Sequence, residues 1–412
     1  MNDRFSATYR IRTDGEARRV ADEMAGESST ATFVPIPGER AEIAALHGAR
    51  VELLEIAPVT SSAPSAGPAV QDATVTISWP LDNTGLSLPN ILATCAGNLF
   101  DVRGVTTLRL LDVGLPKALA SVYPGPQFAS AGTKRLLGIG NRPLVGTIVK
   151  PSIGLTPAET AALVAKLADG RIDFIKDDEL MADPPHSPFE QRVDAVLDIL
   201  RRHEDNTGHR VMYAFNVTGE IDDMLRRHDY VVARGGNCIM ASVNWIGVTG
   251  LAHLRRHAAV PIHGHRNGWG FMTRGPSFGI EFTAWQKMLR VAGVDHLHVN
   301  GLDNKFFEAN ESVIKSARAC LAPVFDDGGP SYQAMPVFSS KQTVNQAEKT
   351  WKALRSTDLI FAAGGGILAH PDGVEAGVRS IREAWEAAVA GVPLDEYAAD
   401  RGFLQNAIAA FA

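Results

Sequence analysis

The stretch Leu144-Val-Gly-Thr-Ile-Val-Lys-Pro-Ser-Ile-Gly-Leu-Thr-Pro-Ala-Glu159 contains a short apolar run followed by the beginning of a helix. The run from Leu144 to Val149 is mostly apolar and β-branched, which is typical of a buried strand. Thr156 can cap a helix that begins at Pro157, and Glu159 completes a capping box three residues after the cap. The stretch therefore predicts one strand followed by one helix.

The same order of strand and helix recurs along the chain from about Pro143 onward. Eight apolar runs each precede a plausible helix, and the predicted strands are Leu144–Val149, Asp173–Ile175, Val211–Phe215, Cys238–Val243, Pro261–His263, His296–Val299, Ala334–Phe338 and Leu359–Phe361. Eight such units in about 270 residues fit a closed barrel of parallel strands. We therefore predict that residues 123–412 form a (β/α)8 barrel.

Residues 1–122 show a different pattern, which predicts a separate α+β domain. Its predicted elements are strands at Tyr9–Ile11 and Ala73–Ile77 and helical stretches at Ala17–Met24 and Leu115–Ala120. The small and polar segment Ser61–Gly67 is interpreted as a loop inside this domain, because apolar runs flank it on both sides. The stretch Tyr123–Arg142 is rich in Gly and Pro and is the better domain boundary.

Composition and charge exclude several classes of protein. The chain has 412 residues, 45% of them hydrophobic and 21% charged, as in ordinary globular proteins. Its net charge of −6 is spread along the chain without a basic run, so we expect no nucleic-acid partner. We expect no membrane partner and a cytoplasmic location, because no segment approaches the roughly 18 apolar residues of a membrane span. Cys95, Cys238 and Cys320 form no CxxC pair, which favours buried thiols over a disulfide or zinc site.

Polar side chains follow several of the predicted barrel strands. Residues just past the carboxyl ends of parallel barrel strands converge on one rim, where active sites are found. In this chain they are Lys150, the segment Lys176-Asp-Asp-Glu179, His265, Arg266, His298 and, further along its loop, Lys305. We therefore expect a functional site at this rim.

The segment from Lys176 to Glu179 has the composition of a site for a hard cation. Lys176 and Asp178 can face the same way because side chains alternate along a strand, and Glu179 can join them as the chain turns. Two carboxylates and one further oxygen ligand suit Mg2+. A lysine ammonium has no acceptor, so Lys176 becomes a ligand only if CO2 converts it to a carbamate. Taken alone, the segment fits a solvated charged loop better.

Five segments taken together give a much more specific signal. They are Gly146-Thr-Ile-Val-Lys-Pro-Ser-Ile-Gly-Leu155, Asp173-Phe-Ile-Lys-Asp-Asp-Glu179, His263-Gly-His-Arg266, Asp295-His-Leu-His298 and Gly364-Gly-Gly-Ile-Leu-Ala-His-Pro371. In order and spacing they resemble the large subunit of RuBisCO. The resemblance extends into the N-terminal domain through Glu27-Ser-Ser-Thr-Ala-Thr32 and Ala96-Gly-Asn-Leu-Phe100. It covers nearly the whole chain and implies a (β/α)8 TIM barrel behind a ferredoxin-like domain.

The resemblance implies a role for each matched position in the barrel. Lys176 is similar to the lysine that activator CO2 carbamylates, and Asp178 and Glu179 are similar to the other Mg2+ ligands. Lys150 matches the lysine that moves protons at the reacting carbons. The implied site makes and uses an enediolate of a phosphorylated sugar-derived substrate.

The resemblance also implies substrate-binding positions. His265 and Arg266 match a pair whose arginine grips a phosphate. Further matches to substrate and phosphate contacts are His298, Ser339 and the backbone amides of Gly364 and Gly365. Glu27, Thr32 and Asn98 match residues that the N-terminal domain lends to the site of a second subunit, which implies a homodimer or a higher homo-oligomer.

Several departures from the family pattern argue against carboxylation of ribulose bisphosphate. Ser152 stands where carboxylating members have a second lysine, and Ser340 and Lys341 replace a pair of glycines. The loop from Val299 to Glu308 keeps Lys305 but lacks the glycines that let the carboxylase loop close. The chain is therefore similar to the RuBisCO-like proteins.

The RuBisCO-like proteins include a sulfur-salvage enolase, an isomerase of 5-methylthioribulose 1-phosphate, and enzymes that decarboxylate or hydrolyse 3-oxo-isoapionate 4-phosphate. The enolase takes its base from a lysine where this chain has Asn98, which disfavours that reaction. Lys305 could lie over a leaving carboxylate, which favours carbon–carbon cleavage of a phosphorylated 3-oxo sugar acid. The sequence does not separate decarboxylation from hydrolysis. Isomerisation or enolisation is the alternative, and a non-catalytic binder of phosphate esters would need no metal-carbamate site.

Overall fold

The computed structural model describes residues 3–31, 41–57, 70–325 and 328–412. The described chain divides into two compact units. The sheet unit comprises Met1–Pro124, Gly268–Ala292 and Pro323–Ser331, and the barrel unit comprises Gly125–Asn267, Gly293–Ala322 and Tyr332–Ala412. The boundary between residues 122 and 123 stays a prediction, and the predicted loop Ser61–Gly67 lies outside the described residues.

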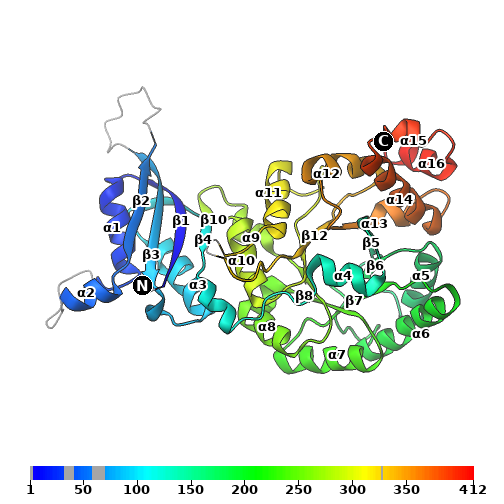
Figure 1. Ribbon diagram of the computed structural model, residues 1–412, viewed down its shortest axis with the longest axis horizontal. Helices are drawn as coiled ribbons and strands as arrows, with labels where there is room; N and C mark the ends of the chain where they lie inside the picture. Colours follow the sequence, from blue (N-terminus) through cyan, green and yellow to red (C-terminus); the bar gives the residue numbers. More distant parts are fainter. Residues whose placement is uncertain (1–2, 32–40, 58–69, 326–327) are drawn as a thin grey trace. The chain divides into compact units, whose positions relative to one another are not determined.

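The sheet unit is built on a five-stranded sheet in the order β10-β4-β1-β3-β2 (Figure 1). Its strands are β1 (Arg4–Thr13), β2 (Arg50–Ile56), β3 (Gln71–Pro80), β4 (Val105–Gly114) and β10 (Phe278–Ile280). Its helices are α1 (Ala17–Glu27), α2 (Ala41–His47), α3 (Leu88–Ala96), α9 (Trp269–Thr273) and α10 (Phe282–Ala292). Alternate residues of β1 are buried from Phe5 to Ile11, so one face of this strand forms core. The predicted α+β architecture is confirmed.

The predictions for the sheet unit differ from the structure in detail. The predicted strands at residues 9–11 and 73–77 form the middle of β1 and β3, which pair antiparallel. The helical stretch predicted at Leu115–Ala120 forms a short 3-10 helix from Lys117 to Ser121 and not an α-helix. Within this 3-10 helix only Leu119 is buried, so little packing is available to extend it. The sequence reasoning missed β2, β4 and β10.

The barrel unit contains a closed barrel of eight parallel strands in the order β11-β12-β13-β5-β6-β7-β8-β9. The strands are β5 (Leu144–Ile148), β6 (Phe174–Lys176), β7 (Met212–Asn216), β8 (Cys238–Ser242), β9 (Ile262–His265), β11 (His296–His298), β12 (Met335–Phe338) and β13 (Ile360–Ala362). Each coincides with a predicted strand to within one or two residues at its ends. The predicted barrel is therefore confirmed.

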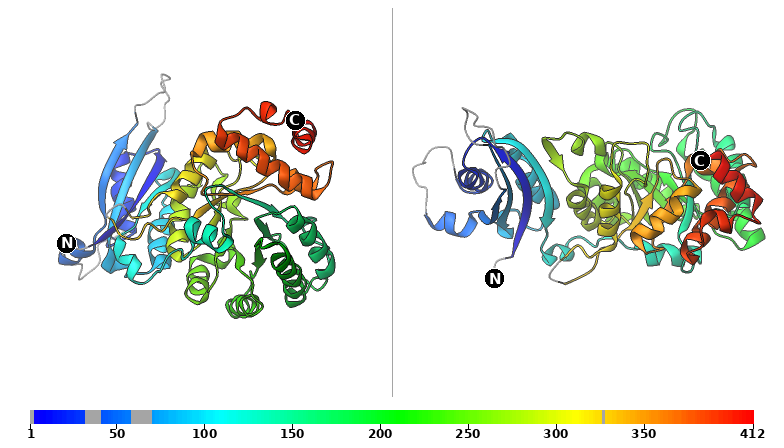
Figure 2. Two further views of the ribbon diagram at one scale, coloured as in Figure 1. Left: turned by 45° about the vertical axis from the view of Figure 1, so that its right-hand side comes forward. Right: turned by 90° about the horizontal axis from the view of Figure 1, so that it is seen from above.

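Helices alternate with the barrel strands and lie around them (Figure 2). They are α4 (Ala129–Leu137), α5 (Pro157–Asp169), α6 (Phe189–Thr207), α7 (Ile221–Ala233), α8 (Val243–His257), α11 (Asn310–Leu321), α12 (Ala347–Leu354), α13 (Gly364–Leu368), α14 (Val374–Ala390), α15 (Leu394–Tyr397) and α16 (Gly402–Ala410). The capping box predicted for α5 is present between Thr156 and Glu159. In the described part of the chain, no helix is both long and apolar enough to cross a bilayer.

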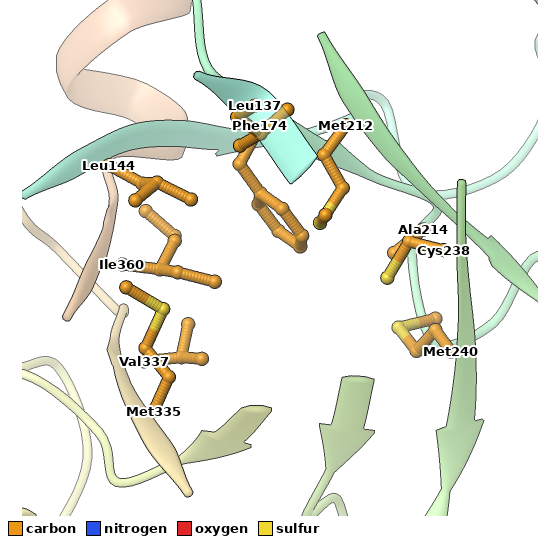
Figure 3. Close-up of a cluster of buried hydrophobic side chains, with 11 residues drawn as sticks. Leu137, Leu144, Phe174, Met212, Ala214, Cys238, Met240, Met335, Val337 and Ile360 are labelled. Carbon is orange, nitrogen blue, oxygen red and sulfur yellow. The ribbon is translucent and has the colours of Figure 1, made fainter. Parts of the chain in front are cut away.

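The interior of the barrel holds a cluster of buried apolar side chains (Figure 3). The cluster consists of Leu137, Leu144, Phe174, Met212, Ala214, Cys238, Met240, Met335, Val337, Ile360 and Ala362. In Figure 3 the labelled side chains point toward one another from several strands. Strands β9 and β11 instead contribute buried His263 and His296, whose ring centroids are 5.7 Å apart. Polar side chains therefore enter the barrel interior from these two strands.

Asp177 determines how the chain leaves β6. Its side chain is buried, and it accepts hydrogen bonds from the Tyr213 hydroxyl at 2.6 Å and the Asn216 amide at 2.9 Å. Arg192 on α6 donates from Nε and Nη2, each 3.3 Å from Oδ2. Successive strand residues face opposite sides, so this anchoring of Asp177 directs the side chains of Lys176 and Asp178 the other way.

Arg192 also organises the segment that follows β6. Its side chain is fully buried and donates to the carbonyl oxygens of Ser187 at 2.7 Å and Ala182 at 2.6 Å. One guanidinium therefore links the Asp177 carboxylate to the loop that carries the chain into α6. The Asp177–Arg192 pair thus positions the segment from Lys176 to Glu179.

We predict that Arg192→Met lowers the free energy of unfolding by about 3–5 kcal/mol, because it leaves the Asp177 carboxylate buried without its cation. The double variant Asp177→Asn/Arg192→Met should recover part of that loss, since no uncompensated charge remains. Urea unfolding followed by circular dichroism measures both. Arg201→Met, on the exposed side of α6, is the matched control and should change stability by less than about 0.5 kcal/mol. An unchanged unfolding midpoint for Arg192→Met would contradict the prediction.

Candidate functional site

Lys176, Asp178 and Glu179 lie together at the carboxyl end of β6. The Lys176 amine is buried, donates to the Asp177 carbonyl at 2.8 Å and lies 3.4 Å from Glu179 Oε2. Lys150 follows β5, and its Nζ lies 2.5 Å from Asp178 Oδ2. The structure thus brings four of the predicted residues, two amines and two carboxylates, into one cluster.

The environment of Lys176 lowers its pKa. Burial is the main cause, because the charged form loses its hydration, and the nearby carboxylates of Glu179 and Asp178 oppose this only in part. The neutral amine, the form that reacts with CO2, is therefore more accessible than in a free lysine. Burial alone would raise the pKa of Glu179, but its neighbours, first His265 and then Lys176, lower it to about 2, so this carboxylate stays ionised.

The donor set fits Mg2+. Asp178 and Glu179 present ionisable carboxylate oxygens beside the Lys176 amine, and a carbamate on that amine would add a third anionic oxygen. These are the hard oxygen donors that Mg2+ prefers. The Lys150 ammonium shows that this cluster already attracts a cation, since it pairs with Asp178.

Three histidines line the site from β9 and β11. His263 Nε2 and His298 Nε2 are 2.8 Å apart, and His298 Nδ1 is 2.9 Å from the Ser339 hydroxyl at the end of β12. The rings of His265 and His298 have centroids 4.5 Å apart. Burial lowers the pKa of each of these three histidines, so the rings are neutral at pH 7 and act through hydrogen bonds.

Arg266 lies at the same end of the site as His298. Its side chain is 8% exposed, and its Nη2 donates to the carboxylate of Glu308, which lies on the segment after β11. The sequence reasoning named Arg266 but not Glu308 or His263. The signal for His263 was its place two residues before His265 on the same strand, whereas nothing local pointed to Glu308.

The glycines after β13 differ in what they do. A Cβ on Gly366 would lie 2.5 Å from the Gln342 carbonyl oxygen, so this glycine is required by packing. A Cβ on Gly365 would meet nothing within 4 Å, and one on Gly364 would meet only Ile148 at 3.7 Å. The main chain at Gly364 and Gly365 is therefore approachable by a ligand, as their predicted phosphate contact requires.

The loops after β11 and β12 hold further residues that the sequence singled out. Lys305 is exposed, and its Nζ lies 5.3 Å from the centroid of the Phe306 ring. Among the described residues, no hydrogen bond or ion pair joins Lys305 to the cluster around Lys176. Ser340 and Lys341 have positive φ angles of 72° and 57°, a backbone conformation that glycine favours.

The residues predicted to serve a second subunit belong to the sheet unit. Glu27 at the end of α1 and Asn98 line one open pocket of about 1220 Å3, together with Gly26 and Asp101. Thr32 lies outside the described residues. The predicted site residues therefore fall in two groups, one in each unit of the chain.

A group of His228, Asp229 and His257 offers ligand atoms within 4.8 Å of one another, in the described part of the chain. His228 Nε2 accepts a hydrogen bond from the Ala259 amide at 3.1 Å, which leaves the ring proton on Nδ1, 2.9 Å from Asp229. A metal at Nδ1 would force a proton onto Nε2, facing the Ala259 N–H. The group is better explained as a hydrogen-bonded link between α7 and α8.

Comparison with known families gives a match over both units. The description "Ribulose bisphosphate carboxylase large chain, catalytic domain" matches residues 130–411. The description "Ribulose bisphosphate carboxylase large chain, N-terminal domain" matches residues 2–119. The solved structure of a rubisco-like protein from Burkholderia fungorum is similar to this chain with a TM-score of 0.91 and 43% identity, and the match covers 99% of each chain.

Two curated relatives are similar over almost their full length. A 3-oxo-isoapionate-4-phosphate transcarboxylase/hydrolase of Xanthobacter autotrophicus is 50% identical, with 99% of each chain covered. A 3-oxo-isoapionate-4-phosphate decarboxylase of Rhizobium rhizogenes is 43% identical, covering 99% of this chain and 98% of that protein. The chain therefore belongs to the RuBisCO large-chain family, as one of its RuBisCO-like enzymes and not as a classical carboxylase.

Proposed function

We propose that the chain cleaves a carbon–carbon bond in a phosphorylated 3-oxo sugar acid such as 3-oxo-isoapionate 4-phosphate, by decarboxylation or by hydrolysis. One observation carries the proposal: a buried lysine with a lowered pKa lies beside two carboxylates at a barrel rim. A protein that only binds phosphate esters has no use for this arrangement. The names of the two relatives support the substrate class.

Asp178, Glu179 and a CO2-derived carbamate on Lys176 would hold Mg2+. When bound, Mg2+ supplies positive charge beside adjacent substrate oxygens, where negative charge develops in the reaction. Lys176 provides the amine for the carbamate, and its burial keeps that amine reactive. Asp178 and Glu179 would supply the other two anionic oxygen ligands.

Decarboxylation needs a place for the electron pair of the breaking bond and a proton for the carbon left behind. The bond between the carboxylate and the neighbouring carbon breaks, CO2 leaves, and the electron pair moves toward the 3-oxo group to give an enediolate. Lys150 is placed to give this enediolate its proton, since its Nζ already reaches Asp178. In the hydrolytic version a water attacks the 3-oxo carbon, and the bond between that carbon and carbon 2 breaks. Carbon 2 leaves with its carboxylate still attached and takes up a proton, and the former 3-oxo carbon becomes a second carboxylic acid.

The remaining residues position the substrate. His265, His298 and Ser339 are neutral groups that can hydrogen-bond to hydroxyl and carbonyl oxygens. The backbone at Gly364 and Gly365 offers amides to the phosphate. Arg266, which is paired with Glu308, would contact a further group of the substrate. Lys305 would lie over the leaving carboxylate.

We also propose a homodimer in which Glu27, Thr32 and Asn98 complete the site of the partner subunit. The support is that Glu27 and Asn98 line one pocket of the sheet unit, whereas the metal-site residues lie in the barrel unit. In a C2 dimer, the pocket of each subunit would complete the barrel site of the other subunit.

Activity is expected to require Mg2+ and to rise after preincubation with bicarbonate, because the carbamate must form on Lys176 before the third oxygen ligand exists. Lys176→Ala should abolish turnover and keep the fold, as read by circular dichroism. Lys166→Ala, an exposed lysine on α5, is the control and should keep wild-type activity. Full activity of the wild type after EDTA treatment and removal of bicarbonate would rule out this metal site.

Mixed dimers test the shared site. Asn98→Ala and Lys176→Ala subunits should each be inactive alone or nearly so, and mixing them should restore part of the activity. The reason is that one site of each hybrid dimer would contain neither substitution. The measurement is turnover after subunit exchange, with hybrid formation followed by mass spectrometry. Hybrids that form without any recovery would show that each chain supplies its own complete site.

Lys305→Met separates cleavage from enolisation. If Lys305 orients the leaving carboxylate, its loss should raise the cleavage barrier by about 2–4 kcal/mol, as for other preorganised electrostatic groups. Exchange of the product's α-proton with deuterated solvent should survive, because it depends on Lys150 and the metal site. Lys315→Met, an exposed lysine on α11, is the control. Cleavage at the wild-type rate in Lys305→Met would refute this role and favour the isomerase alternative.

A further inference from the structure

The pairing of Arg266 with Glu308 bears on which substrates fit this end of the site. Arg266 follows β9, and its side chain is 8% exposed, while the Glu308 side chain is 6% exposed. Arg266 Nη2 donates to Glu308 Oε2. An arginine in a phosphate-binding position would be expected to keep its positive charge available for the ligand. In this chain a buried carboxylate already neutralises it.

Glu308 is held firmly in this position. Besides Arg266, Asn300 donates from Nδ2 to Oε2 at 3.2 Å, and the Ser312 hydroxyl donates to Oε1 at 2.9 Å. Both carboxylate oxygens therefore have partners. The segment itself is closed by Asn304, whose Nδ2 donates to the carbonyl oxygens of Gly301 at 2.9 Å and Glu308 at 3.0 Å. Glu308 is thus a built part of the site and not a loose counterion.

The charged and titratable groups named here offset one another. Arg266 and Glu308 cancel, and His298 and His263 are neutral because burial lowers their pKa values. A phosphate dianion here would lie close to the Glu308 carboxylate in a poorly hydrated place, where like charges repel strongly. An uncharged hydroxyl meets no such repulsion, since it can accept a hydrogen bond from Arg266 and donate one to Glu308.

We propose that Glu308 is a specificity-determining residue that closes this end of the site to phosphate and admits an uncharged hydroxyl-bearing group. The chain then takes a sugar or sugar acid with one phosphate and rejects bisphosphates. This inference rests on the proposed function only in assuming that Arg266 and His298 face the substrate.

Equilibrium binding tests the inference without turnover. Isothermal titration calorimetry in Mg2+ and bicarbonate would compare ribulose 5-phosphate with ribulose 1,5-bisphosphate. The wild type should bind the bisphosphate no more tightly than the monophosphate. Glu308→Gln, which keeps the shape of the side chain and removes its charge, should bind the bisphosphate at least about tenfold more tightly and the monophosphate within about twofold of wild type. Glu311→Gln, an exposed carboxylate on α11, is the matched control and should change neither.

A second variant tests whether the added affinity for the bisphosphate depends on Arg266. Arg266→Met/Glu308→Gln replaces both partners of the buried pair and should lose the added bisphosphate affinity. Two results would overturn the inference: a wild type that binds the bisphosphate tenfold more tightly than the monophosphate, or a folded Glu308→Gln that gains nothing. If Glu308→Gln does not fold, the affinities of the wild type for the bisphosphate and the monophosphate still test the inference. A failure of the proposed function would show separately, as a wild type that releases neither CO2 nor an acid fragment from the 3-oxo substrate.

Discussion

The site depends on one constraint. The carboxylate of Asp177 is buried, so its negative charge must be balanced by a cation and by hydrogen-bond donors. A buried charge without partners is strongly destabilising, so Asp177 is bound where Tyr213, Asn216 and Arg192 can donate to it. Because neighbours on a strand face opposite ways, this fixes the side on which Lys176 and Asp178 appear. The placement of these two residues thus follows from the hydrogen bonds and the ion pair of Asp177, which is not one of the predicted metal ligands.

Most of the barrel strands could be predicted because they are buried, nearly continuous apolar runs bounded by polar residues, whereas β9 and β11 are rich in buried histidine. The edge strands of the five-stranded sheet, β2 and β10, could not be predicted. In β2 every residue is exposed or only half-buried, and β10 has three residues around Gly279, so neither carries an apolar pattern. Leu115–Ala120 looked helical by composition, but the chain there forms only a 3-10 helix of five residues, of which Leu119 is the buried one. Local composition therefore failed where burial was weak.

The site residues at the strand ends could be predicted, because the carboxyl ends of parallel barrel strands meet at one rim. The hydrogen-bond partners of a given carboxylate could not be predicted, because they come from distant parts of the chain. Asp178 and Asp295 lie in equally polar motifs, yet they do different things. Asp295 accepts hydrogen bonds from the amides of Phe128 at 2.6 Å and Ile262 at 2.9 Å and pairs with Arg255 at 2.8 Å. Its partners come from distant parts of the chain. A sequence shows that a carboxylate is present, but only the fold shows whether main-chain amides or a ligand will satisfy it.

The same poorly hydrated interior links the chemistry of the site to its selectivity. Burial lowers the pKa of Lys176 and of the histidines His265 and His298, so charge on these groups is disfavoured. In this poorly hydrated interior, one additional carboxylate changes which charged ligand groups can bind, because water screens its charge poorly. Glu308 is such a group, and its long-range pairing with Arg266 left no local mark in the sequence. A RuBisCO-like barrel can thus keep the residues for enediolate chemistry while one loop carboxylate changes which end of a sugar phosphate it accepts.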